Sequence, residues 1–493
     1  MNKENKEKVK SNVCQIKDCG RPTHKESKYC IFHASAEEKT VGEFKEALKE
    51  YVNKIKKEDG DYDFEKFIFI GDIDFKKDLN ITIFKNADFT EATFEGVANF
   101  TEATFSGFAN FTEATFSRVA YFTEATFEGL ADFTEATFEG VAHLQEATFK
   151  GGANFIEATF ERLAYFKGAT FSGVANLPEV TFKGQADFTE VTFKGQANFI
   201  EATFEGLAYF KGATFSGVAY LSEATFKGQA DFTETTFKGQ AYFTEATFEG
   251  DADFKLKYLI KGINLLKLKV FSGKKISINV MNGKGKISFK RAYLENIYLD
   301  IELVECVLID FTDTLFRNTK VEKDKIKNHI LQEKEKKFSK AKEIYLLLKN
   351  NFHSIGQYED ESWAYKKEKD MERKSNCHFK TLHKWLWSCF LNGIFGYGIQ
   401  PSKVIMSAIL IITLFSFLFM NPGISNIVGI EEITSNNFFD CLYFSTITFT
   451  TLGYGDFRPL EGLGRFLAGS EAFIGAFMMA LFVYTFARRT GGR

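Results

Sequence analysis

The segment Ala87–Val97 reads ADFTEATFEGV, and the next segment, Ala98–Phe108, reads ANFTEATFSGF. The same eleven-residue unit recurs sixteen times, and its last copy begins at Ala252. Self-similarity at one fixed period is typical of repeat proteins, in which each unit packs only against its neighbours. These residues therefore decide the fold of the middle third of the 493-residue chain.

An eleven-residue period also occurs in right-handed coiled coils, so the helical interpretation has to be tested first. On a helix the two Phe residues of each unit would lie roughly 140° apart, and no single apolar stripe would form. In an extended chain, each Ala-x-Phe places both side chains on one face, and the residue between them points away. Such sides recur after five and six residues alternately. The pattern predicts a chain that winds through repeated turns around a core of Ala and Phe.

This pattern resembles the pentapeptide-repeat family, with Phe at the central position and Ala two residues before it. The resemblance implies a right-handed quadrilateral β-helix, which we expect over residues 62–316. The alternating spacing departs from the family's strict period of five and leaves the geometry of the corners open. At about 4.8 Å between strands, the sixteen units give eight coils and a rod of roughly 38 Å with capped ends. Less regular coils are expected to continue the core between Phe289 and Ile309.

The repeats are acidic, whereas the rest of the chain is basic. Residues 88–253 hold 25 acidic and nine basic side chains, a net charge of −16, so the rest carries +13 within a total of −3. Acidic pentapeptide-repeat rods that imitate DNA are a theme of that family, so a membrane-anchored interaction scaffold is the alternative function. Lysines interrupt the acidic faces at Lys183, Lys194, Lys227 and Lys238. We expect no nucleic acid as a partner, and the sequence identifies no cytoplasmic protein or ligand of the rod.

Near the N-terminus, the segment CQIKDCGRPTHKESKYCIFH carries cysteine and histidine at close spacing. Cys14, Cys19, Cys30 and His33 are separated by four, ten and two residues. Three thiolates and one imidazole complete a tetrahedral shell, which predicts a structural Zn²⁺ site within residues 1–35 rather than a catalytic one. Two alternatives stay open: His24 replaces His33 as a ligand, or the four residues are unconnected.

Charged segments with a helical period separate these parts of the chain. Residues 36–61 are predicted to form a helical linker, and residues 317–378 a hairpin of two antiparallel helices. Residues 379–402, with Trp385 and Trp387, are predicted to form an interfacial helix and turn at the cytoplasmic leaflet. That segment includes the tripeptide Gly396–Gly398, which neither follows a Thr-rich apolar helix nor precedes an Asp.

Two apolar stretches further on are long enough to cross a bilayer, and we predict spans at residues 403–421 and 464–487. The apolar stretch 438–450 between them is too short to cross, so we expect a re-entrant helix. Basic residues flank the spans (Lys380, Lys384, Lys403, Arg488 and Arg489), and the loop between the spans holds mainly acids, including Glu431, Glu432 and Glu461. The positive-inside rule then places both termini in the cytoplasm and the chain in the cell (inner) membrane.

After the expected re-entrant helix, Thr451–Gly455 reads TLGYG, and Asp456 follows. An extended strand at this depth needs partners for its carbonyl groups, and lining an ion path makes it tolerable. Gly453 and Gly455 permit the positive φ values that let successive carbonyls face one axis. The run resembles the pore helix and filter of potassium channels, specifically the two-helix class found in prokaryotes, with Leu452 in place of the commoner Val.

The resemblance implies that Thr451, Leu452, Gly453, Tyr454 and Gly455 form the selectivity filter, whose carbonyls replace the water of a K⁺ ion. It also implies that Tyr454 packs outward against the pore helix and that Asp456 lies at the outer mouth. Because one chain supplies one filter strand, a homotetramer is required. Such a channel conducts passively and performs no chemical reaction, so we expect no enzyme. A non-selective cation channel is the alternative within this class.

Two residues of the second span are candidates for a role in gating. Glu471 is a carboxylate inside the membrane, where ionisable groups are usually functional; it could act in gating, support the back of the filter or bond to neighbouring backbone. Gly475 lies where a pore-lining helix of the family often has its hinge, but a small residue also lets helices pack closely. The sequence has no Arg-rich voltage sensor, nucleotide fingerprint or calcium loop, so it does not identify the stimulus.

Overall fold

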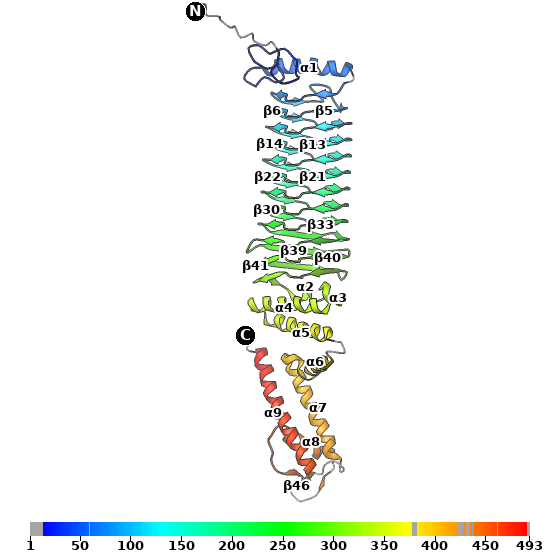
Figure 1. Cartoon of the computed structure of the whole chain (residues 1–493), viewed down its shortest axis with the longest axis vertical. Helices are drawn as coiled ribbons and strands as arrows, with labels where there is room; N and C mark the ends of the chain where they lie inside the picture. The colour runs from blue at the N-terminus through cyan, green and yellow to red at the C-terminus, as the bar shows by residue number, and fades with distance from the viewer. Residues whose placement is uncertain are drawn as a thin grey trace, which may run out of the picture. The chain divides into compact units, whose positions relative to one another are not determined.

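The computed structural model describes residues 13–58, 60–376, 382–421, 427–429, 434–435, 437–460 and 462–490. The chain divides into two compact units, residues 1–334 and 335–493, whose elements are labelled in Figure 1. Lys380, Glu431, Glu432 and Glu461 lie outside the described residues, as do the side chains of Arg488 and Arg489. The expected charge difference across the membrane therefore rests mainly on the sequence.

The first unit contains a parallel β-helix with four short strands in each regular coil. One such coil consists of β5 (Ala87–Asp88), β6 (Thr93–Phe94), β7 (Ala98–Asn99) and β8 (Thr104–Phe105). Each strand pairs in parallel with the strand 22 residues further on, so Phe116 lies opposite Phe138. The described strands, from β1 (Tyr62–Asp63) to β45 (Lys320–Val321), form three sheets of twelve strands and one of nine. The predicted β-helix is confirmed, and it is longer than the eight coils of the regular repeats.

The coils after Ala252 lose the regular repeat but keep the parallel register. Their longer strands are β35 (Ala252–Leu256), β39 (Lys275–Val280) and β42 (Tyr298–Leu303). These strands pair in succession along one sheet. The core in this part is built from buried aliphatic side chains such as Leu265, Ile276 and Leu299. Less regular coils thus continue the core, as the sequence predicts.

The corners of each regular coil alternate between two kinds, which explains the alternating spacing. At the two-residue corner Thr90-Glu91, the amide of Ala92 donates to the carbonyl of Phe89 at 3.0 Å, the hydrogen bond of a β-turn. Glu91 has a φ of 52°. Gly168 and Gly212 stand at equivalent corners, also with positive φ. The third position of this turn therefore requires a left-handed backbone, and in most coils the residue there is Glu.

The three-residue corner usually contains Gly for a different reason. A Cβ on Gly195 would lie 2.2 Å from the carbonyl oxygen of Gly173 in the preceding coil. The close approach of two backbones, rather than a positive φ, thus favours Gly here. Arg118 and Arg162 stand at two equivalent positions, so the preference for Gly is not absolute.

The core of the β-helix consists of columns of stacked Phe rings. The rings of Phe111 and Phe133 are 4.8 Å apart and within 1° of parallel, and those of Phe133 and Phe155 are 4.8 Å apart and within 3°. This distance equals the spacing of paired strands, so backbone pairing and ring stacking are satisfied together. Leu replaces Phe in three coils, at Leu144, Leu177 and Leu221, and all three are fully buried.

Helix α1 (Val41–Glu58) covers the N-terminal end of the β-helix (Figure 1, blue). It buries Phe44, Leu48, Val52 and Ile55, and the ring of Phe44 packs edge-on against Phe69 of the first coil at 5.7 Å. The open edges and apolar core of the first coil are thereby covered, as the ends of a solenoid require.

Two short helices, α2 (Lys323–Ile326) and α3 (Leu331–Lys334), follow the last coil. Gln332 on α3 donates to Asp310 Oδ1 at 2.6 Å and to the Thr312 hydroxyl at 2.8 Å. Ile330 forms a parallel bridge with Ile309. These contacts cover the C-terminal end of the β-helix, so both ends are capped.

The second unit is mainly helical. Its helices are α4 (Phe338–Ser354), α5 (Tyr358–Ser375), α6 (Leu382–Phe395), α7 (Pro401–Met420), α8 (Phe438–Phe449) and α9 (Gly462–Thr490). Its described strands are β46 (Ile427–Gly429), β47 (Thr434–Ser435) and β48 (Phe457–Pro459). The helices α4 and α5 pack together, with the rings of Tyr345 and Trp363 5.5 Å apart. Gly396–Gly398 forms the short 3₁₀ helix η2 rather than a strand.

We predict that Phe155→Ala lowers the free energy of unfolding of the β-helix by roughly 3–5 kcal/mol, because it leaves a cavity in the core between the ring of Phe133 and Leu177. Phe155→Leu should cost clearly less, since Leu177 occupies the equivalent position of the next coil. Unfolding of the full chain followed by circular dichroism in the strand region measures both. Equal losses for the two variants would contradict the stacked-core account.

Candidate functional site

Two helices of the second unit, α7 and the part of α9 over Gly462–Ala487, are long and apolar enough to cross a bilayer. The shorter apolar helix α8 contacts both of them (Figure 1). Phe415 and Phe419 from α7 pack with Cys441, Phe444 and Ile447 from α8 in one buried cluster. This cluster holds α8 against α7. The position of α8 in turn sets where the segment after it begins.

The strand expected to be the filter begins as the C-terminal cap of α8. The amide of Thr451 donates to the carbonyl of Thr448 at 3.0 Å, and the amide of Leu452 donates to the carbonyl of Ile447 at 2.9 Å. Thr451 has a φ of 56°, which is the left-handed residue of a Schellman-type cap and is uncommon for a β-branched side chain. The last carbonyls of the helix are thereby satisfied by the amides of the strand.

Positive φ values recur at every second residue of this strand: 56° at Thr451, 50° at Gly453 and 79° at Gly455. In a strand of uniform negative φ, successive carbonyls point to opposite sides. Reversing φ at alternate residues allows them to face the same side instead. The carbonyl oxygens of Thr451, Leu452, Gly453 and Tyr454 accept no hydrogen bond from the described residues. They are available as ligands for a cation.

The large side chains of this strand are uncovered within one chain. Leu452 is 60% exposed and Tyr454 is 70% exposed. The packing of Tyr454 against the pore helix that we expected is therefore not made within one chain. An exposed Leu and Tyr beside unpaired carbonyls indicate a surface that other molecules complete.

The residues that follow Gly455 are held by two contacts. The Tyr443 hydroxyl on α8 donates to Asp456 Oδ2 at 2.7 Å. Immediately afterwards, β48 pairs antiparallel with β46, and Phe457 lies opposite Gly429. Asp456 is thus held at the end of the strand by one bond to the helix that precedes it.

Helix α9 packs against α8 at two successive turns. Glu471 and Ser445 are both fully buried and are hydrogen-bonded to each other. One turn further on, a Cβ on Gly475 would lie 1.9 Å from the carbonyl oxygen of Phe449. A side chain at Gly475 would therefore force the two helices apart just before the strand begins.

In the first unit, the four predicted metal ligands lie together. Cys14, Cys19, Cys30 and His33 place their ligand atoms within 4.8 Å of one another. His33 Nδ1 is 3.4 Å from Cys14 Sγ and 3.3 Å from Cys30 Sγ, and the Cys19 and Cys30 sulfurs are 3.8 Å apart. His33 Nε2 lies 3.1 Å from the carbonyl oxygen of Glu65, which leaves Nδ1 to face the cysteines. His24 is outside the cluster, with its Nε2 3.9 Å from Glu43.

Burial disfavours the charged forms of Cys30 and His33. It raises the pKa of the Cys30 thiol to about 12 and lowers the pKa of His33 below its ordinary value. A divalent ion would stabilise three neighbouring thiolates here. The donor set has the composition of a closed structural zinc site.

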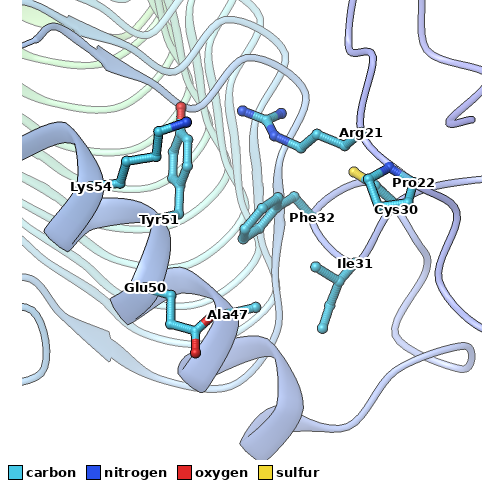
Figure 2. Close-up of a pocket in the computed structure, with 9 residues that line it drawn as sticks. All are labelled: Arg21, Pro22, Cys30, Ile31, Phe32, Ala47, Glu50, Tyr51 and Lys54. Carbon is cyan, nitrogen blue, oxygen red and sulfur yellow. The ribbon is translucent and has the colours of Figure 1, made fainter. Parts of the chain in front are cut away.

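A pocket of about 450 Å³ lies beside the cluster (Figure 2). Loop residues Arg21, Pro22, Cys30, Ile31 and Phe32 form one side, and Ala47, Glu50, Tyr51 and Lys54 from α1 form the other. The Arg21 guanidinium lies 4.8 Å from the Tyr51 ring centre and 5.3 Å from that of Phe32. Its Nη1 lies 3.7 Å from Cys19 Sγ, and in the described part of the chain it pairs with no carboxylate.

Several residues that contact the candidate sites were not singled out from the sequence. Ser445 and Tyr443 lie within the channel-like motif, but their partners Glu471 and Asp456 are 26 and 13 residues away. A small polar residue inside an apolar helix is the signal that would have singled out Ser445. Arg21 would have been harder to single out from the sequence, since a basic residue in a polar loop is common.

Comparison with protein-family models gives two matches. The model described as pentapeptide repeats (9 copies) matches residues 82–126, 111–159, 133–181, 177–221 and 210–255. The model described as ion channel matches residues 404–491, which include most of α7 and all of α8, the segment Thr451–Gly455 and α9. No curated protein and no solved structure shows significant similarity to the chain. The chain therefore joins a β-helix of pentapeptide repeats to an ion-channel domain of the two-helix type.

Proposed function

We propose that the chain forms a homotetrameric, potassium-selective channel that conducts K⁺ passively down its electrochemical gradient. The observation that carries this proposal is the strand Thr451–Gly455, with alternating positive φ and with unpaired carbonyls at Thr451 to Tyr454. Carbonyl oxygens facing one axis replace the hydration shell of a cation, as the TLGYG sequence leads one to expect. The same geometry would serve a non-selective cation channel, which ion-substitution measurements distinguish.

The tetramer is supported by what one chain leaves uncovered. One strand cannot surround an ion, and Leu452 and Tyr454 are more than half exposed on it. In a fourfold ring each filter strand packs against neighbouring copies, which would cover these side chains. The C-terminal ends of four α8 helices would then point toward the cavity and favour a cation.

We place the channel in the inner membrane with both termini in the cytoplasm, on the basis of the basic residues that flank the spans. The β-helix would then be cytoplasmic, with a regulatory or scaffolding role. An acidic surface supports the scaffold alternative: Glu113, Glu135, Glu157, Glu179, Glu201 and Glu223 recur in one corner column and form no ion pair with described residues. A basic partner would be complementary to that column.

We further propose that Cys14, Cys19, Cys30 and His33 bind one structural Zn²⁺, with His33 as an Nδ1 ligand. Zinc with three thiolates would carry one net negative charge. Arg21, 3.7 Å from Cys19 Sγ and without a carboxylate partner in the described residues, is placed to offset it. His33 also contacts the carbonyl of Glu65, so the metal would hold the N-terminal cap onto the first coil.

Flux of K⁺ or Rb⁺ into proteoliposomes that contain the full chain tests the channel. We expect uptake by the native chain and none by Gly453→Asp, because an acidic side chain would interrupt the carbonyl strand. The chain offers a matched control, Gly398→Asp, which makes the same change in the other Gly-Tyr-Gly. Equal uptake of Na⁺ and K⁺ would reject selectivity, and unchanged uptake by Gly453→Asp would reject the assigned filter.

For Gly475, the contact with Phe449 supports a packing role rather than a hinge. Gly475→Ala should lower both the flux and the melting temperature of the assembly, because the added Cβ meets backbone. The control is Gly469→Ala on the same helix, where an added Cβ meets nothing within 4 Å. If Gly475→Ala reduces flux while the melting temperature stays unchanged, the hinge role is preferred.

Metal analysis of the purified full chain should find about one zinc per chain. Cys19→Ser should abolish it, whereas Cys306→Ser, at an exposed cysteine outside the cluster, should not. Removal of zinc by a chelator should also lower the melting temperature of the first unit, because the N-terminal cap loses its cross-link. A native chain without bound metal would eliminate the zinc site.

A further inference from the structure

The least expected polar group in the ion-channel domain is Glu471. It is fully buried on α9, as are Ser445 on α8 and Ser416 on α7. Ala468 and Ile474, three residues before and after it on α9, pack against the apolar cluster between α7 and α8. Among the described residues, its Oε2 has no hydrogen-bond partner and neither oxygen forms an ion pair. An ionised carboxylate in such a place would be costly.

The contacts around Ser445 bear on the protonation state of Glu471. The Ser445 hydroxyl has a single proton and lies 2.9 Å from the carbonyl oxygen of Ile412 on α7. The same oxygen of Ser445 is hydrogen-bonded to Oε1 of Glu471. A carbonyl can only accept, so the single Ser445 proton must be shared between Ile412 and Glu471 unless Glu471 carries a proton of its own. Two full hydrogen bonds form when Ser445 donates to Ile412 and a protonated Glu471 donates to Ser445. Glu471 is then a neutral carboxylic acid.

This chain of two bonds crosses all three helices. It runs from Glu471 on α9, through Ser445 on α8, to the backbone of Ile412 on α7. One turn along α8, Phe449 meets Gly475 of α9, and Thr451 follows two residues later. The bonds therefore fix the rotation and depth of α8 immediately behind the start of the filter strand.

We propose that Glu471 is a positioning residue that acts as a neutral acid: its proton joins α9 to α8 and α7 and so holds the filter strand in its conducting geometry. The residue neither lines the ion path nor titrates during conduction. This inference rests on the proposed function, because the geometry it maintains is that of the filter.

Replacing Glu471 by a side chain of the same shape distinguishes its role as a hydrogen-bond donor from simple packing. In Glu471→Gln, the side-chain amide donates to Ser445 as the acid does, so K⁺ flux should stay within about twofold of the native rate. In Glu471→Ala and in Ser445→Ala the donor chain is broken, and flux should fall by about tenfold. The double variant should lose no more than either single variant, because both remove the same unit.

Ser416→Ala is the matched control. Ser416 is equally buried and donates to the same carbonyl oxygen of Ile412, at 2.7 Å, but it makes no bond to Glu471. Its loss should leave flux close to the native rate. A fall in flux as large as that of Ser445→Ala would show that the carbonyl of Ile412, rather than the proton of Glu471, is what matters.

Infrared spectroscopy of the full chain in lipid tests the protonation state without any flux. The native chain should show a protonated-carboxyl C=O band at neutral pH that is absent in Glu471→Gln. Absence of this band, or a Gln variant as impaired as the Ala variant, would overturn the proposal. If the native chain conducts no ion but shows the band, the proposed function fails while the neutral acid stands.

Discussion

Both parts of this chain depend on where the backbone places its amide and carbonyl groups. In the β-helix, every coil bonds to the coils above and below it, with amide–carbonyl distances such as 2.9 Å from Thr137 to Ala114. In the ion-channel domain, α8 uses the amides of Thr451 and Leu452 to satisfy its last carbonyls. The carbonyls of Thr451 to Tyr454 accept no hydrogen bond from the described residues. Backbone groups pair from coil to coil in the first part, whereas in the second part unpaired carbonyls are what the proposed function requires as cation ligands.

The repeat achieves this backbone pairing with few residue types, because each position of the unit has one structural role. Phe fills the core at the spacing of paired strands, and Ala leaves room for it. The two-residue corner needs a left-handed residue, and the three-residue corner needs space beside a neighbouring carbonyl. Since these demands recur in every coil, the sequence repeats, and it stops repeating only where the core changes to Leu, Ile and Val.

The ion-channel domain shows how a polar network can support a backbone ligand from behind. Tyr443 holds Asp456 at the exit of the strand, and Ser445 with Glu471 lies behind its start. Each pair joins α8 to a segment on the far side of the filter strand in the sequence. The pair of Ser445 and Glu471 is buried, so losing either partner would leave an unpaired polar group in an apolar surrounding.

The sequence by itself determined the β-helix and the two long apolar helices, because periodic and continuous apolar residues act locally. It also singled out the TLGYG segment after the short apolar helix and the four predicted metal ligands, which lie close together in the sequence. The geometry of the three-residue corner, the contact of Gly475 with Phe449 and the bond of Glu471 to Ser445 needed the tertiary structure. Their partners are 22 or more residues away, and only the folded backbone sets the distances between them. One chain leaves Leu452 and Tyr454 uncovered, and in the proposed tetramer neighbouring chains would cover them.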